Sequence, residues 1–166
     1  MADDDDDDRH PAYRELCELM RKLDFAERYY TYCSSHSKKN CPDIPLALQT
    51  KALDETGRTF RYDKREKFFS WRDSNAPKGC ELGLNLSLRD AQANWILVLK
   101  TPSGHLGEQF SAIAEGVKRL ADPRYQHEPR FPTPDIANAT ELRTIITEGL
   151  ALYDDIATAL RSKAWK

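Results

Sequence analysis

Three side chains that can ligate zinc lie close together in the sequence: Cys33, His36 and Cys41. Thiolate sulfur and imidazole nitrogen are ligands that Zn²⁺ prefers, usually four of them in a tetrahedron. Cys80 would have to be the fourth ligand, and the spacing of this set does not fully match a zinc finger or a zinc ribbon. Zinc binding and ordinary thiols therefore both stay open for Cys33, His36 and Cys41, and we expect no cofactor.

Two other histidines have neighbours that suit acid–base chemistry. His105 lies near Glu108, and His127 lies in a proline-rich strap over residues 124–135. Imidazole exchanges protons near neutral pH, as a general acid or base must. However, residues 105 and 108 of a regular strand point to opposite faces, and no nucleophile elbow accompanies them. A small hydrolase-like enzyme that uses His105 or His127 in a pocket under the strap is therefore the alternative hypothesis, and a protein without catalytic residues is the preferred one.

The sequence pattern predicts a β-sheet among the elements that position these side chains. Leucine alternates with small or polar residues over 82–88, which predicts a strand with one buried face. The apolar run 95–99 predicts a core strand, and residues 105–110 return after a turn as a third strand. Segments 59–62 and 67–71 are rich in aromatic or β-branched residues, which predicts an earlier hairpin with a charged tip. The pattern predicts an antiparallel meander of about five strands.

Helical patterns lie on both sides of this sheet in the sequence. Apolar residues at three- and four-residue spacing predict a helix over 11–34, kinked near Asp24. A short helix is expected over 112–121, and a long C-terminal helix is expected to follow Asn138 as its N-cap. Gly149 within the apolar stripe of that helix indicates a close approach to the sheet. The fold class is therefore α+β, with the N- and C-terminal helices on one face of the sheet and the other face partly open.

Length and composition predict one folded unit with an acidic tail. Residues 1–9 include six consecutive aspartates and are expected to be disordered, and residues 10–166 are expected to form a single α+β domain. Residues 46–53 fit a strand and a helix equally well. No apolar run approaches the roughly 18–20 residues that cross a bilayer, and no apolar leader is visible. We therefore expect a cytoplasmic protein with reduced cysteines that does not bind membranes.

The predicted hairpin mixes charged and aromatic residues, which is typical of a protein-binding surface. Aromatic and arginine side chains are favoured interface anchors, and mixed charge provides specificity. Such residues can also bind nucleic acid, but the acidic residues of the hairpin and the tail would repel phosphate, so we expect a protein partner. The residues predicted to contact the partner, because they lack an evident role in the core, are Tyr62, Asp63, Arg65, Glu66, Trp71, Arg72 and Asp73.

The segment Thr59–Phe69, the leucine-alternating strand, the segment Gly104–Gly107 and the closing helix together resemble the small immunity proteins of bacterial polymorphic toxin and contact-dependent inhibition systems. The resemblance covers about residues 10–163 and consists of chain length, order of elements and general residue pattern. It implies a cytoplasmic protein that binds a cognate toxin domain and blocks the active site of that toxin. It implies no catalytic residues in this chain.

Overall fold

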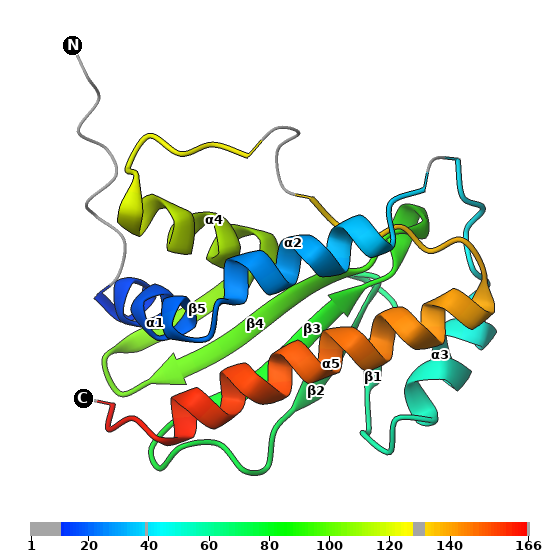
Figure 1. The fold of residues 1–166 in the computed structure, drawn as a ribbon. Coiled ribbons are helices and arrows are strands. Elements are labelled where there is room, and N and C mark those ends of the chain that lie inside the picture. The colour runs from blue at the N-terminus through cyan, green and yellow to red at the C-terminus, as the bar shows by residue number, and fades with distance from the viewer. Residues whose placement is uncertain (1–10, 39, 128–131, 166) are drawn as a thin grey trace.

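A computed structural model describes residues 11–38, 40–127 and 132–165 of the chain (Figure 1). The expected acidic tail, residues 1–9, lies outside the described residues. The helices are α1 (Pro11–Lys22), α2 (Phe25–Ser35), α3 (Leu46–Asp54), α4 (Phe110–Ala121) and α5 (Ala139–Arg161). The strands are β1 (Arg61–Asp63), β2 (Phe68–Arg72), β3 (Glu81–Ser87), β4 (Asn94–Thr101) and β5 (Gly104–Gln109), and the short 3-10 helix η1 (Arg89–Ala91) joins β3 to β4.

The strands form one sheet in the order β1-β2-β3-β4-β5, and each strand pairs antiparallel with the next. The predicted five-stranded meander and the α+β class are therefore confirmed. The register places Leu84 opposite Leu97 and Leu86 opposite Trp95. These four side chains are almost completely buried, because they point to the face of the sheet that the helices cover.

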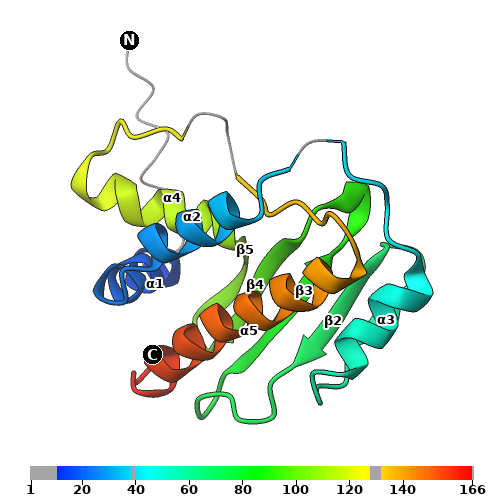
Figure 2. The same ribbon diagram turned by 45° about the vertical axis from the view of Figure 1, so that its right-hand side comes forward.

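The five helices of the described residues lie on this one side of the sheet, which we call the helix side (Figures 1 and 2). Trp95 shows how they meet the sheet, since its ring stacks on Phe110 of α4 with centroids 6.1 Å apart, and its Nε1 donates to the Tyr32 hydroxyl of α2 over 2.9 Å. The ring also lies against Gly149 of α5, where an added Cβ would be 2.3 Å from Cζ2. The predicted close approach of the long helix at Gly149 is thus confirmed.

Local chemistry explains where the helices begin and end. The helix predicted over 11–34 is in fact two helices, because Asp24 has a φ of 51° and interrupts the helical backbone. The side chain of Asn138 accepts a hydrogen bond from the Glu141 N–H over 2.9 Å and caps α5, as predicted. Residues 46–53 are helical. None of the helices in the described parts of the chain has both the length and the apolarity needed to cross a bilayer.

Candidate functional site

The second face of the sheet, which we call the open face, carries no helix in the described residues (Figure 2). The register assigns alternate strand residues to it, and its central row runs across all five strands. That row consists of Arg61, Ser70, Asn85, Ile96 and Gln109. Every member is at least partly exposed, so the row is accessible to another molecule.

Apolar side chains lie among the polar ones on the open face. Phe68 and Ile96 are half-buried there, and Val98 is 8% exposed between Gly83 and Gly107 of the neighbouring strands. Protein interfaces combine apolar groups with hydrogen-bonding groups in this way. Two half-buried apolar side chains, Phe68 and Ile96, thus interrupt the polar surface of the open face.

The β1–β2 hairpin, residues 61–72, places the predicted contact residues on two sides of the sheet. Arg61 pairs with Ser70, so the side chain of Arg72 shares the open face with Arg61. The tip residues Arg65 and Glu66 are exposed. Tyr62 instead points to the helix side, where its ring lies 4.9 Å from that of Phe69. The seven predicted residues therefore do not form one continuous surface.

Two of those residues have a structural role on the helix side. Trp71 packs edge-on against Tyr153 of α5 at 5.3 Å, and the Arg58 guanidinium lies 4.7 Å above the Trp71 ring. The side chain of Asp73 is only 7% exposed, and its Oδ2 accepts hydrogen bonds from the Tyr153 hydroxyl over 2.8 Å and from Arg161 over 2.6 Å. The expectation that Trp71 and Asp73 lack a role in the core was wrong, because the pleat turns Trp71 inward and α5 supplies partners for Asp73. Contact with a partner stays a prediction for both.

Replacing Asp73 with alanine is expected to lower the free energy of unfolding by about 1–3 kcal/mol, because Tyr153 and Arg161 lose a charged acceptor. Glu66→Ala at the exposed hairpin tip is the matched control and should change stability by less than about 0.5 kcal/mol. Urea unfolding followed by circular dichroism measures both. Equal effects of the two substitutions would show that Asp73 has no structural role.

The hairpin tip is ordered by its own hydrogen bonds. Oδ1 of Asp63 accepts from the N–H groups of Arg65 and Glu66, both over 2.8 Å, and the Asp63 carbonyl accepts from the Lys67 N–H over 2.8 Å. Asp63 thus holds the turn, which is a common role for aspartate. A fixed backbone lowers the entropy cost of binding through the tip side chains.

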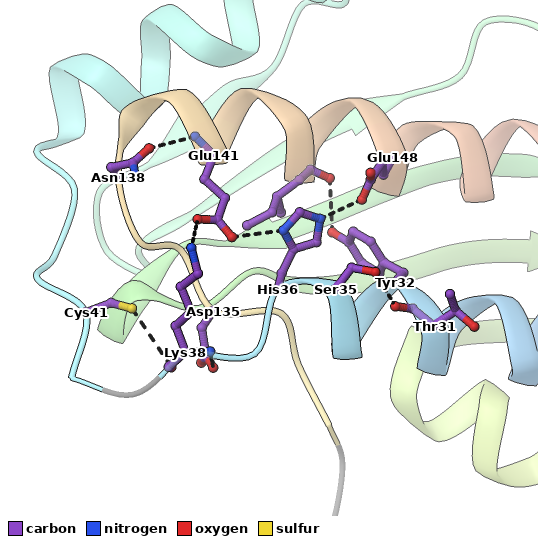
Figure 3. Close-up of polar contacts among 11 residues, drawn as sticks. Thr31, Tyr32, Ser35, His36, Lys38, Cys41, Asp135, Asn138, Glu141 and Glu148 are labelled. Carbon is purple, nitrogen blue, oxygen red and sulfur yellow. Dashed lines mark hydrogen bonds and ion pairs between the residues drawn. The ribbon is translucent and has the colours of Figure 1, made fainter.

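A second polar cluster surrounds His36, the residue that follows α2 (Figure 3). Its Nδ1 lies 3.0 Å from Glu141 Oε1 and its Nε2 lies 2.6 Å from Glu148 Oε2, and both glutamates belong to α5. Lys38 donates to the other oxygen of Glu141 over 3.0 Å. Because carboxylates only accept, both ring nitrogens donate here and the imidazole carries a positive charge.

The charges in this cluster shift the pKa values of His36 and Glu141. Burial acts to lower the pKa of His36, but the hydrogen bonds and negative charges of Glu141 and Glu148 outweigh burial and raise that pKa above its ordinary value. The hydrogen bond from His36, assisted by Lys38, lowers the pKa of Glu141 although burial opposes this shift. A histidine that donates from both nitrogens has no lone pair with which to accept a proton or ligate a metal. The arrangement fastens the end of α2 to α5.

The two cysteines near His36 do not share a site with it. Cys33 is buried in α2, where burial raises the pKa of its thiol to about 12, and its Sγ lies 3.7 Å from the Pro132 carbonyl. Cys41 lies on the loop after α2 with its Sγ 3.9 Å from the Lys38 carbonyl (Figure 3). The described residues contain no group of three or more His, Cys, Asp or Glu side chains that could hold a metal ion. The geometry thus gives no support to a zinc site at Cys33, His36 and Cys41.

The histidines of the alternative enzyme hypothesis lie on opposite sides of the sheet. His105 is exposed on β5 opposite Lys100, on the open face, whereas Glu108 pairs with Leu97 and faces the helix side, as the pleat predicts. His127 contacts the Tyr30 ring of α2 at 4.7 Å. The structure therefore does not combine the two histidines in one site, and acid–base catalysis by either of them stays a prediction.

Sequence reasoning missed the two glutamates of the His36 cluster. They lie more than 100 residues from His36 in the chain, so no local motif joins them. One signal was present, because Glu141 and Glu148 are seven residues apart and therefore share a face of α5. Glu148 also lines a groove of about 410 Å³ between α2 and α5, together with Tyr32 and Ser35.

Comparisons with known proteins give no relative from which a role could be transferred. No family model matches the chain, and neither a curated protein nor a solved structure matches it significantly. The resemblance to immunity proteins therefore depends on the sequence features alone and stays a prediction.

Proposed function

We propose that this chain is a non-catalytic protein-binding module of the immunity type, which binds and neutralises a cognate bacterial toxin domain. The observation that carries the proposal is the one-sided architecture, in which five helices pack on the helix side and leave the open face accessible (Figures 1 and 2). Antiparallel sheets often have one wet face, but that face is then polar along each strand. Here the half-buried Phe68 and Ile96 interrupt the polar pattern, which favours contact with a partner.

The size of the open face fits a protein partner. The five strands have three to eight residues each, and at about 3.3 Å per residue and about 4.8 Å between strands they give a flat area on the order of 500 Å². A typical stable interface buries about 800 Å² on each partner. The side chains that protrude from the sheet and the hairpin tip would supply the area that the flat sheet lacks. The sheet also provides a rigid platform, which lowers the entropy cost of binding.

Two titratable groups with shifted pKa values, His36 and Cys33, support a role without catalysis. Catalytic residues combine a shifted pKa with access to a substrate. The nitrogens of His36 are both occupied by carboxylates, and burial raises the pKa of the Cys33 thiol far from neutrality, so the thiolate nucleophile is disfavoured. Both groups serve packing between α2 and its neighbours.

Site-specific photo-crosslinking in the source cell tests the proposal. A photoreactive amino acid is placed at Ser70 or Asn85 on the open face, and at the exposed positions Thr144 or Thr158 of α5 as matched controls. We expect the open-face positions to crosslink one discrete protein that the α5 positions do not, because only the open face lies in the interface. Expression of the captured protein should inhibit growth, and co-expression of this chain should relieve the inhibition.

Two results would overturn this proposal. One is the absence of a discrete crosslinked protein from Ser70 and Asn85. The other is a captured protein whose activity and toxicity are the same with and without this chain. The crosslinks identify the face that binds, and the growth assay identifies the inhibition, so the two parts of the proposal are tested separately.

A further inference from the structure

We infer that the partner presents an acidic protein surface to this chain and that Arg61 and Arg72 on the open face receive its carboxylates. The inference depends on the proposed function and specifies the chemistry of the partner. It starts from the hairpin cations, which have no ion pair within the described residues, whereas Lys100 of the same open face is paired with Glu81.

The hairpin concentrates cations that have no carboxylate partner. Between residues 61 and 72 the chain has five positive side chains against two negative ones. Within the described residues, none of the five lies within 4 Å of a carboxylate oxygen. One of the two acids, Asp63, already accepts two N–H groups of the turn. The five cations are Arg61, Lys64, Arg65, Lys67 and Arg72.

Three arginines on the helix side are paired instead. Arg58 bonds Asp154 over 2.8 Å, Arg143 bonds Glu55 over 2.7 Å, and Arg161 bonds Asp73 over 2.6 Å. These arginines already have carboxylates, so an acidic partner would have to break an existing pair to use them. As far as the structure describes the chain, the hairpin cations have no such pair to break.

The geometry of the two open-face arginines suits the recognition of neighbouring carboxylates. Arg61 lies opposite Ser70, and Arg72 is two residues farther along β2 on the same face, which makes the two arginines diagonal neighbours about 7–8 Å apart. Arg72 is partly oriented, because its Nη1 donates to the Asn85 side chain over 3.3 Å and to the Trp71 carbonyl over 3.1 Å. An arginine offers a planar fork of donors that matches a carboxylate.

The same cations could contact phosphate, but the aromatic rings argue against nucleic acid. Single-stranded nucleic acids bind where bases stack on aromatic side chains. Tyr62 and Trp71 face the helix side, so Phe68 provides the one phenyl or indole ring that the register assigns to the described part of the open face. An acidic protein surface fits these observations better.

Titration of the full chain with defined probes tests the inference. The probes are a glutamate-rich peptide, a lysine-rich peptide of equal length, and an oligothymidylate with as many charges as the acidic peptide, all at low ionic strength. We expect the acidic peptide to bind best and to shift the backbone NMR signals of Arg61, Ser70, Arg72 and Asn85. The double variant R61E/R72E should weaken this binding by about tenfold or more, because two attractions become repulsions.

A matched control separates a site from a general charge effect. The variant R21E/K22E changes the net charge equally at two exposed cations of α1, and it should change the affinity by less than about twofold. The neutral variant R61Q/R72Q should show an intermediate loss, and circular dichroism establishes that each variant is folded. Equal losses for R61E/R72E and R21E/K22E would overturn the inference, as would stronger binding of the oligothymidylate at the same residues. Self-association through the open face in sedimentation equilibrium would also overturn it.

The outcome also distinguishes this inference from the proposed function. If the Ser70 crosslink captures a toxin that R61E/R72E binds equally well, the function stands and the acidic partner is refuted. If the acidic peptide binds at Arg61 and Arg72 while no protein is captured in the cell, the immunity function is refuted and the carboxylate-binding site stands.

Discussion

Replacing Gly149 with alanine is expected to lower the free energy of unfolding by about 1–3 kcal/mol through overpacking. The new Cβ would lie 2.3 Å from Cζ2 and 2.4 Å from Cε2 of Trp95, well inside van der Waals contact. Trp95 has no room to move away, since it is 1% exposed and is held by Phe110 and by the Tyr32 hydroxyl. Alanine is a better helix former than glycine by about 1 kcal/mol, which offsets only part of the loss. Urea unfolding measures the change.

A double-mutant cycle identifies the cause of this destabilisation. Phenylalanine lacks the indole atoms that the new Cβ would meet, so in a Trp95→Phe background Gly149→Ala should be neutral or stabilising. Gly107→Ala is a control on β5, where an added Cβ has no neighbour closer than 4.0 Å and should cost less than about 1 kcal/mol. If Gly149→Ala destabilises both backgrounds equally, close packing against Trp95 is not the reason that glycine occupies this position.

The stability of the protein is expected to fall as the pH rises above neutrality, because His36 fastens α2 to α5 only in its charged form. The His36 pKa is raised in the folded state, so this contribution is complete below the unfolded value of about 6.5 and is lost as the pH passes through the raised pKa. A neutral imidazole would direct a lone pair at a carboxylate of Glu141 or Glu148. We expect a contribution of about 1–2 kcal/mol, since Glu148 is half exposed and water screens its charge.

Urea unfolding of the wild type and of His36→Gln at a series of pH values between 6 and 9 measures this contribution. The stability difference between the two proteins should be largest at pH 6 and should shrink as the pH rises. Glu148→Gln removes one of the two acceptor charges and should reduce the pH dependence without abolishing it, because Glu141 remains. A stability difference that is constant across the series would show that the charge on His36 does not contribute.

Periodicity predicted the sheet well because a strand alternates its side chains strictly. The leucines of 82–88 and the apolar run 95–99 became β3 and β4, with Leu84 and Leu97 facing each other under the helices. The same parity places Trp71 and Arg72 on opposite faces, but it does not say which face will be covered. That choice depended on α5, whose Tyr153 packs on Trp71, and it removed Trp71 from the surface that the hairpin was expected to present.

The sequence by itself determined the α+β class, the meander, the Asn138 cap and the contact at Gly149, since each follows from local periodicity or from the chemistry of one residue. Only the tertiary structure decided which residues of α5 bind His36 and Asp73. Those features join atoms that are 80 or more residues apart in the chain, as in the Tyr153–Asp73 and His36–Glu141 hydrogen bonds. Burial and charge pairing depend on which segments meet in space. A local sequence pattern does not say which distant segments will meet.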